Sequence, residues 1–286
     1  GNWIWPSPPI NNASVALAAP ANNLSSARQR ILTGLALGGV FLAALLGLPT
    51  PAWAALMLFI VGLGGWEWAG LMKQERPARL AYAIVTPLLT LAVYQSVPRE
   101  WIAGLAAAFW LLVAPLWLAR GWPIEGGPGG ALLGWLLLIP TGFAAIHLHA
   151  HSPLFLLACI LLAVIADSAA YFSGRRFGKH KLAPRISPGK SWEGALGAAL
   201  AIAVYALLVS LFAWRETVAH SAAVLGYAMI LFVASILGDL FESHAKRQAG
   251  IKDSGHWLPG HGGVLDRIDS LSAVLPLALC FLLLWQ

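Results

Sequence analysis

Long apolar stretches recur along the whole sequence, and they decide which class of fold the chain can adopt. A helix needs ~20 apolar residues to cross a bilayer. Nine stretches approach that length, at residues 31–48, 52–72, 80–97, 101–119, 130–148, 153–171, 193–214, 221–240 and 270–285. Only 10% of the residues are charged, which leaves too little polar surface to cover a water-soluble globule. We therefore predict an all-α polytopic integral membrane protein with about nine transmembrane helices.

The basic residues predict how these helices are oriented. Lys and Arg near the ends of membrane spans accumulate on the cytoplasmic side. If the N-terminus is cytoplasmic, all but two of the 18 Lys and Arg residues fall in cytoplasmic segments, the exceptions being Arg99 and Arg215. We therefore expect the N-terminus in the cytoplasm and the C-terminus outside. The net charge of +6 then reflects orientation and anionic substrates, and we expect no nucleic-acid partner.

The chain divides into a short tail and a membrane domain. Residues 1–27 are rich in Pro, Asn, Ala and Ser and are expected to form a flexible N-terminal tail, and residues 28–286 form the polytopic domain. Two cytoplasmic segments of this domain, 172–192 and 241–269, are long, polar and rich in glycine, whereas most other connections are short. Polar groups that interrupt an apolar chain mark the places where a membrane protein acts, so we expect function to concentrate there.

Four aspartates accompany these two segments and suggest a cation site. On the predicted topology, Asp167, Asp239, Asp266 and Asp269 lie at one membrane depth on the cytoplasmic side. Asp239 and Ser243 are four residues apart and share a helical face, as do Asp266 and Asp269 if the last helix begins there. Oxygen ligands without a Cys or His cluster suit Mg²⁺, so the four aspartates are candidate metal ligands. The alternative is that they cap helices or pair with nearby Lys and Arg.

Basic residues and glycines alternate with these acids. Lys246, Arg247, Lys252 and Arg267 supply positive charge beside the carboxylates, an arrangement typical of phosphate-transfer sites. The run Gly260-His261-Gly262-Gly263 permits close backbone approach, which suits a loop that folds around phosphates. A tight turn after Pro259 explains the same glycines without any ligand.

The segment that leads into the span at 193–214 carries a helix start. Ser191 is a natural N-cap, and Glu193 favours the positive end of the helix. Neither Lys190 nor Ser187 is needed for capping. These two residues either contact a phosphate or nucleotide or lie in a solvent-exposed loop, and the sequence favours neither alternative.

Two further signals stay open or are set aside. Glu67 lies within an apolar span between Trp66 and Trp68, so it is either a functional residue or an internal hydrogen-bond acceptor. His147, His149 and His151 alternate like metal ligands, but the topology puts them on the outer face, away from the acids. For these histidines an interfacial role is favoured.

Two blocks of this sequence resemble the phosphatidate cytidylyltransferase family, also called CDP-diacylglycerol synthases. The first block is Ser243-His244-Ala245-Lys246-Arg247, then 252–255 (KDSG) and 258–269 (LPGHGGVLDRID). The second consists of 167–171 (DSAAY), 174–178 (GRRFG) and 186–194 (ISPGKSWEG). The resemblance covers about residues 160–286, which is therefore the expected catalytic region of the membrane domain. Ala245 departs mildly from the family pattern, and residues 1–27 have no obvious counterpart.

The resemblance implies that CTP and phosphatidate react to give CDP-diacylglycerol and pyrophosphate. It implies a divalent cation such as Mg²⁺, with room for a second cation, and a homodimer among membrane lipids. It also implies a bacterial inner-membrane location with the active site facing the cytoplasm. Candidate catalytic residues are Asp239, Asp266, Lys246 and Arg247, and candidate metal ligands are Asp239, Asp266, Asp167 and Asp269. Candidate substrate-binding residues are Ser243, Lys190, Ser187, Lys252, His261, Gly262, Gly263 and Arg267.

Three alternatives are weighed against this interpretation. A secondary transporter could use Asp167, Asp239 and Glu67 as coupling residues, although transporters favour midplane charges and inverted repeats. A CDP-alcohol phosphotransferase would need an Asp-Gly-x-x-Ala-Arg string, which does not occur here. Cytidylylation of another lipid phosphate remains an alternative within the family.

Overall fold

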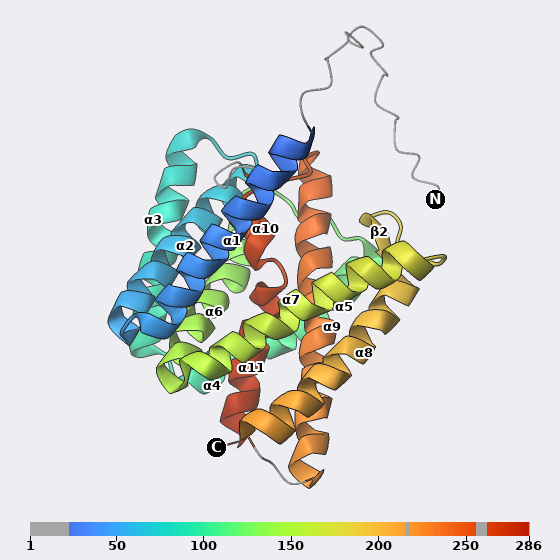
Figure 1. Ribbon diagram of the computed structural model, residues 1–286. Helices are drawn as coiled ribbons and strands as arrows, with labels where there is room; N and C mark the ends of the chain where they lie inside the picture. The colour runs from blue at the N-terminus through green and yellow to red at the C-terminus, as the bar shows by residue number, and fades with distance from the viewer. Residues whose placement is uncertain (1–22, 215–217, 256–261, 286) are drawn as a thin grey trace, which may run out of the picture.

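The computed structural model describes residues 23–214, 218–255 and 262–285. Most of them are helical (Figure 1). The helices are α1 (Asn23–Gly47), α2 (Thr50–Leu71), α3 (Arg76–Ser96), α4 (Arg99–Ala108), η1 (Phe109–Val113), α5 (Ala114–Arg120), α6 (Pro128–His151), α7 (Pro153–Phe177), α8 (Trp192–Leu208), η2 (Val209–Trp214), α9 (Val218–Ala249), α10 (Leu265–Ile268) and α11 (Leu271–Trp285). Two antiparallel strands, β1 (Lys181–Ala183) and β2 (Ser187–Ser191), form a hairpin between α7 and α8.

Eight helical segments of the described chain are long and apolar enough to cross a membrane. One of them, Arg99–Arg120, joins α4, η1 and α5, and another, Leu265–Trp285, joins α10 and α11. The helix α1 adds an apolar section at Gly34–Gly47. The prediction of an all-α polytopic membrane protein is therefore confirmed, and the orientation of its termini stays a prediction. Of the predicted N-terminal tail, residues 1–22 lie outside the described residues, and α1 begins at Asn23.

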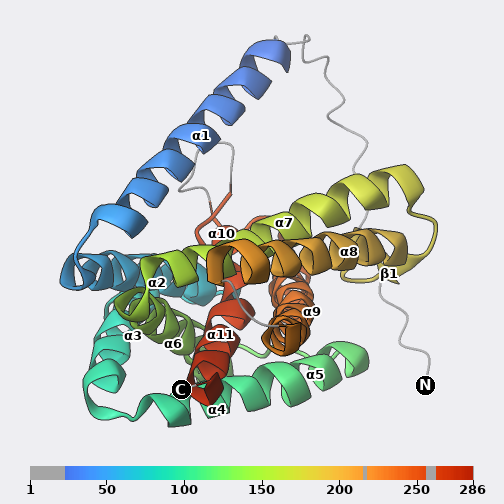
Figure 2. The same cartoon turned by 60° about the horizontal axis from the view of Figure 1, so that its bottom comes forward.

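Helix α6 packs against both α2 and α11 in the interior, while α1 leaves the bundle at an angle (Figure 2). Buried polar atoms at this contact find partners. Trp68 Nε1 donates to the Gly130 carbonyl at 2.8 Å, and the Tyr82 hydroxyl donates to the Ala131 carbonyl at 2.6 Å. Because a buried polar atom is costly without a hydrogen bond, these contacts fix α2 and α3 against α6.

Large apolar side chains cover the outside of the bundle. Leu88 on α3 and Leu196 and Leu200 on α8 are all well exposed. In water such a surface would be unfavourable, but in lipid it needs no polar cover because every helical backbone group is bonded internally. The exposure pattern therefore fits a bilayer environment.

The two polar segments differ from simple loops. Helix α7 continues to Phe177, and α9 continues through its polar end to Ala249. Hydropathy marks only the apolar part of a helix. The span predicted at 221–240 therefore ended before the helix itself, which continues to Ala249. Because residues four apart share a face, this extension aligns Asp239 and Ser243, with Lys246 one turn further on the same side.

The last span is interrupted where it meets α9. Helix α10 ends at Ile268 and α11 begins at Leu271. A Cβ atom at Gly238 would collide with the Asp269 carbonyl oxygen, so only glycine allows α9 to approach the backbone there. This contact brings the polar end of α9 against the start of the last span.

Candidate active site

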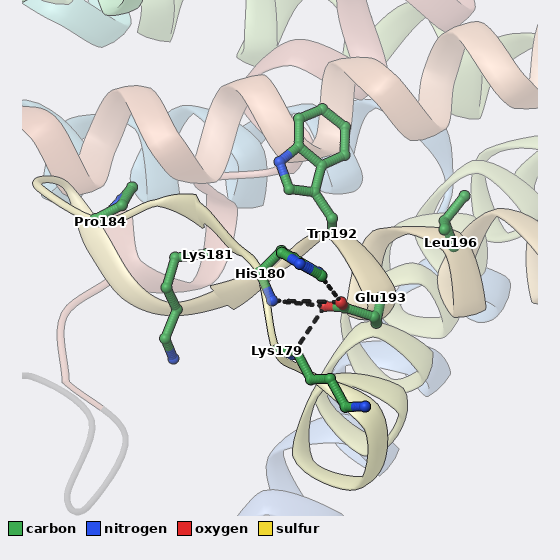
Figure 3. A pocket seen from close by; sticks show the side chains of 7 residues that line it. All are labelled: Lys179, His180, Lys181, Pro184, Trp192, Glu193 and Leu196. Carbon is green, nitrogen blue, oxygen red and sulfur yellow. Dashed lines mark hydrogen bonds and ion pairs between the residues drawn. The ribbon is translucent and has the colours of Figure 1, made fainter.

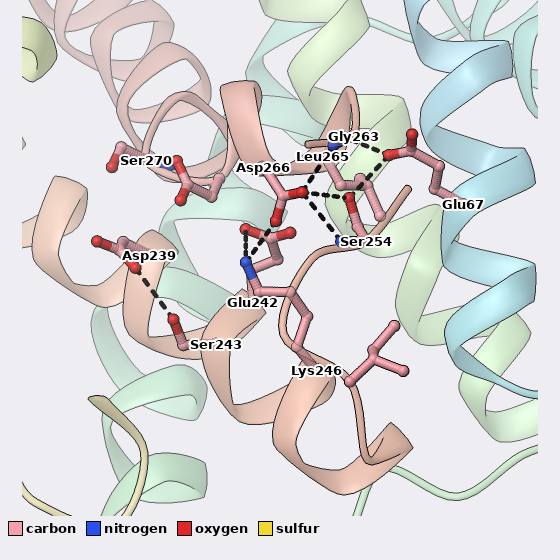
Figure 4. Close-up of polar contacts among 12 residues, drawn as sticks. Glu67, Asp239, Glu242, Ser243, Lys246, Ser254, Gly263, Leu265, Asp266 and Ser270 are labelled. Carbon is pink, nitrogen blue, oxygen red and sulfur yellow. Dashed lines mark hydrogen bonds and ion pairs between the residues drawn. The ribbon is translucent and has the colours of Figure 1, made fainter. Parts of the chain in front are cut away.

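Asp266, in the first turn of α10, is held from several sides (Figure 4). Its Oδ1 atom accepts a hydrogen bond from Lys246 Nζ at 2.6 Å. Its Oδ2 atom accepts from the backbone N–H groups of Ser254 at 2.9 Å and Gly263 at 2.8 Å. Lys246 Nζ also lies 3.3 Å from Glu242 Oε2, which places one ammonium between two acids. All three side chains are largely buried, so each depends on its partners for stabilisation.

The glycines of the predicted phosphate loop pack against these carboxylates. Gly262 has a φ angle of +79°, which favours glycine. A Cβ atom at Gly262 would lie 2.7 Å from Asp266 Oδ2, and one at Gly263 would collide with Ser254 Oγ. The backbone at Gly262 and Gly263 therefore approaches Asp266 closely, and its contact with a phosphate stays a prediction.

Glu67 belongs to this cluster, although its local sequence left its role open. The side chain is 1% exposed and accepts three hydrogen bonds, from Ser254 Oγ, Val264 N and Leu265 N. The interpretation of Glu67 as an internal hydrogen-bond acceptor is confirmed. Glu242 is one of the acids of the polar segments, but it was given no role from the sequence. Its position four residues before Lys246 was the signal that could have identified one.

A second group forms around Asp239. Lys190 Nζ lies 2.5 Å from Asp239 Oδ2, and Ser243 Oγ donates to Asp239 Oδ1 at 3.2 Å. Lys190 comes from strand β2, so the hairpin brings a basic side chain onto the face of α9. The predicted alignment of Asp239 with Ser243 on one helical face is confirmed.

Asp167 and Asp269 lie near Asp239. The Ser270 hydroxyl donates to Asp167 Oδ2 at 3.5 Å, and the Ser270 N–H donates to Asp269 Oδ1 at 2.6 Å. Both carboxylates are close enough to Asp239 to interact with it electrostatically. Three acids, one from α7, one from α9 and one from the α10–α11 junction, therefore lie near one another. This agrees with the prediction that they share one membrane depth.

These aspartates differ in how much capacity they have left for a metal ion. Asp266 Oδ2 takes three donors and Oδ1 takes Lys246, so binding a cation would require Asp266 to exchange partners. Within the described part of the chain, the carboxylate oxygens of Asp167, Asp239 and Asp269 have fewer hydrogen-bond and ion-pair partners than those of Asp266. Among the described residues, no group of three or more His, Cys, Asp or Glu side chains is arranged to enclose a metal. Carboxylates of this kind fit Mg²⁺, which commonly takes one or two of them and completes its shell with water and substrate phosphates.

The remaining candidates lie around the two groups. Arg247 is exposed, and its guanidinium donates to the Ile186 carbonyl at 3.4 Å and the Ile251 carbonyl at 3.3 Å. Ser187 begins strand β2 opposite Ala183, and Lys252 and Arg267 are exposed. His261 lies outside the described residues. Arg247 therefore links the hairpin to the loop after α9, and the structure brings neither Lys252 nor Arg267 into the carboxylate groups.

The hairpin itself is fixed by the start of α8 (Figure 3). Ser191 Oγ accepts from Gly194 N at 3.2 Å, which confirms the predicted N-cap. Glu193 accepts from the backbone N–H groups of Lys179 and His180, and from His180 Nδ1 at 2.6 Å. An open hollow of about 760 Å³ lies beside them, lined by Lys179, His180, Lys181, Pro184, Trp192, Glu193 and Leu196. These bonds anchor both ends of the hairpin and thereby aim Lys190 at Asp239.

One of the three alternating histidines has a packing role at the other end of α6. His149 Nε2 lies 3.0 Å from the Leu45 carbonyl, and its ring stacks on Trp53 with the ring centroids 4.8 Å apart. His149 therefore joins α6 to the end of α1 and the start of α2.

Comparison with known proteins connects this geometry to one family. The model of the cytidylyltransferase family matches residues 28–285. The chain is 42% identical over 267 residues to the phosphatidate cytidylyltransferase of Pseudomonas aeruginosa, covering 87% of this chain and 94% of that protein. It is 38% identical over 279 residues to the phosphatidate cytidylyltransferase of Haemophilus influenzae, with 87% and 96% covered. It is 33% identical over 229 residues to that of Thermotoga maritima, with 78% and 84% covered.

Proposed function

Because this chain belongs to the cytidylyltransferase family, we propose that it transfers the cytidylyl group of CTP to phosphatidate, forming CDP-diacylglycerol and pyrophosphate. The chain is an enzyme of the nucleotidyltransferase class and an integral membrane protein. The observation that carries the proposal is the pair of carboxylate groups around Asp239 and Asp266, each joined to a lysine. Both substrates are anions, so a site for them needs positive charge that is held in place.

The reaction needs positioning and charge neutralisation more than a strong base. The second pKa of a phosphate monoester is about 6, so the phosphatidate oxygen is already largely deprotonated at neutral pH. That oxygen forms a bond to the α-phosphorus of CTP while the bond from the α-phosphorus to the bridging oxygen breaks, and pyrophosphate leaves. No proton has to be removed from the attacking group, which agrees with a site that contains acids, lysines and glycines.

Different residues would bind the metal ion and the substrate phosphates. One or two of the carboxylates of Asp167, Asp239 and Asp269 would hold Mg²⁺, alone or with a second cation, with water and substrate phosphates completing the shell. The bound ion would supply positive charge at the triphosphate. Lys190 is a flexible side chain on the hairpin, and its ammonium can pass from Asp239 to a phosphate oxygen as substrate binds. Lys246 is held between Glu242 and Asp266, which gives it a fixed position from which to attract a phosphate. Arg247 and Ser243 would border the same anion site.

The substrates define the membrane face that we propose for the site. Phosphatidate keeps its phosphate at the bilayer interface, and CTP arrives from the cytoplasm. The excess of Lys and Arg in the predicted cytoplasmic segments supports an active site on that side. The bacterial relatives support an inner-membrane location. A homodimer remains an expectation from the family.

Formation of labelled lipid from labelled CTP tests the proposal. The purified protein in detergent is given phosphatidate, Mg²⁺ and CTP, and a parallel panel contains other lipid phosphates. We expect the labelled lipid to appear with phosphatidate and to be lost in Asp239→Asn. The matched control is Glu75→Gln, an exposed acid before α3 that makes no side-chain cap.

The panel also separates the alternatives. Labelled product only with another lipid phosphate would replace phosphatidate as the substrate. No labelled lipid with any member of the panel would reject the proposed reaction.

A further inference from the structure

A buried acid on α2 holds the backbone that leads into the candidate site. Glu67 Oε1 accepts from Val264 N at 2.9 Å, and Oε2 accepts from Leu265 N at 2.8 Å and from Ser254 Oγ at 2.9 Å. Val264 and Leu265 immediately precede Asp266. Because hydrogen bonds to an ionised acceptor are shorter and stronger than neutral ones, this carboxylate is a firm anchor for the segment.

Ser254 links Glu67 directly to Asp266. Its hydroxyl lies 2.9 Å from Glu67 Oε2 and 3.1 Å from Asp266 Oδ2, so two carboxylates share one donor hydrogen. The backbone N–H groups of Ser254 and Gly263 then complete the shell of Asp266 (Figure 4). The chain on either side of residues 256–261 is thus folded around two acids, one from α2 and one from α10.

The glycines fit a carboxylate at this position. A Cβ atom at Gly255 would collide with Glu67 Oε1, and one at Gly263 would collide with both Ser254 Oγ and Glu67. Gly255 and Gly263, one on each side of residues 256–261, therefore leave space for the same side chain. This is independent of the hydrogen bonds and indicates that the segment is shaped around Glu67.

The residues immediately before and after Glu67 in α2 are held in place by contacts with other helices. Trp66 lies under the Arg79 guanidinium, with the Arg79 Cζ atom 4.4 Å from the ring centroid. Trp68 donates to the Gly130 carbonyl at 2.8 Å. Because Trp66 and Trp68 are fixed against α3 and α6, Glu67 has a fixed position relative to the bundle. Its hydrogen bonds therefore hold the loop in a fixed position as well.

We propose that Glu67 is a positioning residue for the Asp266–Lys246 pair, an inference that rests on the proposed function. Glu67 acts through Ser254 and the backbone at 264–265, and it does not touch substrate. Its replacement by glutamine keeps the shape of the side chain but turns one acceptor into an NH₂ donor that faces other donors. The loop must then shift, and Asp266 and Lys246 shift with it.

The test compares Glu67→Gln with Thr90→Val. Thr90 is fully buried in α3, and its hydroxyl donates to the Thr86 carbonyl at 2.9 Å, so its loss also removes a buried hydrogen bond within the bundle. A displacement of about 1 Å at a reacting group can cost about 100-fold in rate. We expect kcat of Glu67→Gln to fall by about that factor with little change in KM for CTP, since Glu67 does not bind substrate. Thr90→Val should keep kcat near the wild-type value at a similar thermal unfolding temperature.

Amide hydrogen exchange provides a readout that needs no turnover. We expect the segment 262–268 to exchange faster in Glu67→Gln than in the wild type, and at the wild-type rate in Thr90→Val. If the wild type is active and Glu67→Gln matches Thr90→Val in kcat, or if its exchange at 262–268 is unchanged, the role of Glu67 is rejected. If the wild type forms no labelled lipid at all, the proposed function fails, and exchange still decides whether Glu67 anchors the loop.

Discussion

Lys190 Nζ lies 2.5 Å from Asp239 Oδ2, so a residue of the β1–β2 hairpin forms an ion pair with a residue of helix α9. Both side chains are partly buried. The hairpin is anchored by Glu193 and Ser191 at the start of α8, and this fixes where Lys190 can reach. The ion pair therefore joins the two polar segments of the chain into one site.

Loss of this lysine should weaken CTP binding. In Lys190→Met the stem of the side chain remains and the charge is lost, so KM for CTP should rise by about 10-fold or more, since a hydrogen bond to a charged group contributes about 1.5–3 kcal/mol. The control is Lys181→Met, an exposed lysine of the neighbouring strand β1. Steady-state kinetics with labelled CTP measure both. Equal KM values in the two variants would contradict a role for Lys190 in binding the nucleotide.

The two site aspartates should both be essential, but with different effects on the loop. We expect Asp239→Asn and Asp266→Asn each to lower CTP-dependent activity by about 100-fold or more, because aligned charges stabilise the transferring phosphate. Of these two aspartates, Asp266 alone accepts hydrogen bonds from Ser254 and Gly263, so Asp266→Asn should speed hydrogen exchange at residues 262–268 and Asp239→Asn should not. Full activity in either variant would remove that aspartate from the catalytic group.

Removal of divalent cations should stop turnover reversibly. A chelator is expected to abolish formation of labelled lipid, and added Mg²⁺ should restore it, because one or two of the carboxylates of Asp167, Asp239 and Asp269 would provide only part of a coordination shell. Thermal unfolding of the protein with and without chelator gives the control for stability. Turnover that continues without divalent ions would rule out the metal-assisted reaction.

The positive φ angle at Gly262 should make this position intolerant of a side chain. Gly262→Ala places a Cβ atom in a backbone conformation that costs about 1–2 kcal/mol for other residues, and 2.7 Å from Asp266 Oδ2. We expect loss of activity with lower thermal stability. Gly226→Ala is the control, because a Cβ atom at Gly226 in α9 meets nothing within 4 Å. A tolerated Gly262→Ala would show that the loop adopts another backbone path.

Reporter fusions can test the predicted orientation. A reporter inserted at residue 150, in the last turn of α6, and one at the C-terminus should both lie outside the cytoplasm. A reporter at residue 180, in the connection that leads to the hairpin, should lie inside. Cytoplasmic signals at both residue 150 and the C-terminus would reverse the topology.

Local sequence patterns predicted those contacts whose partners are close along the chain. Ser191 was predicted as an N-cap, and its hydroxyl accepts the Gly194 N–H as capping requires. Asp239 and Ser243 were predicted on one face of a helix, and they are hydrogen-bonded. Such contacts follow from helix geometry alone, so a spacing of three or four residues is enough to predict them.

Contacts between distant segments could not be read in this way. Glu67 and Val264 are far apart in the sequence, and no periodicity connects an acid in one apolar span with a backbone N–H beside the last. Glu242 was missed because its polar segment looked like a loop, whereas α9 continues as a helix to Ala249.

The sequence by itself determined that the chain is a helical membrane protein, which two polar segments are the candidates for its chemistry, and which family they resemble. These properties depend on hydropathy, spacing and residue type, which are local quantities. The tertiary structure decided that Lys190 pairs with Asp239, that Lys246 lies between Glu242 and Asp266, and that Glu67 supports the loop. Those pairings arise when packed helices bring charges together at low dielectric, where each buried charge must find a partner.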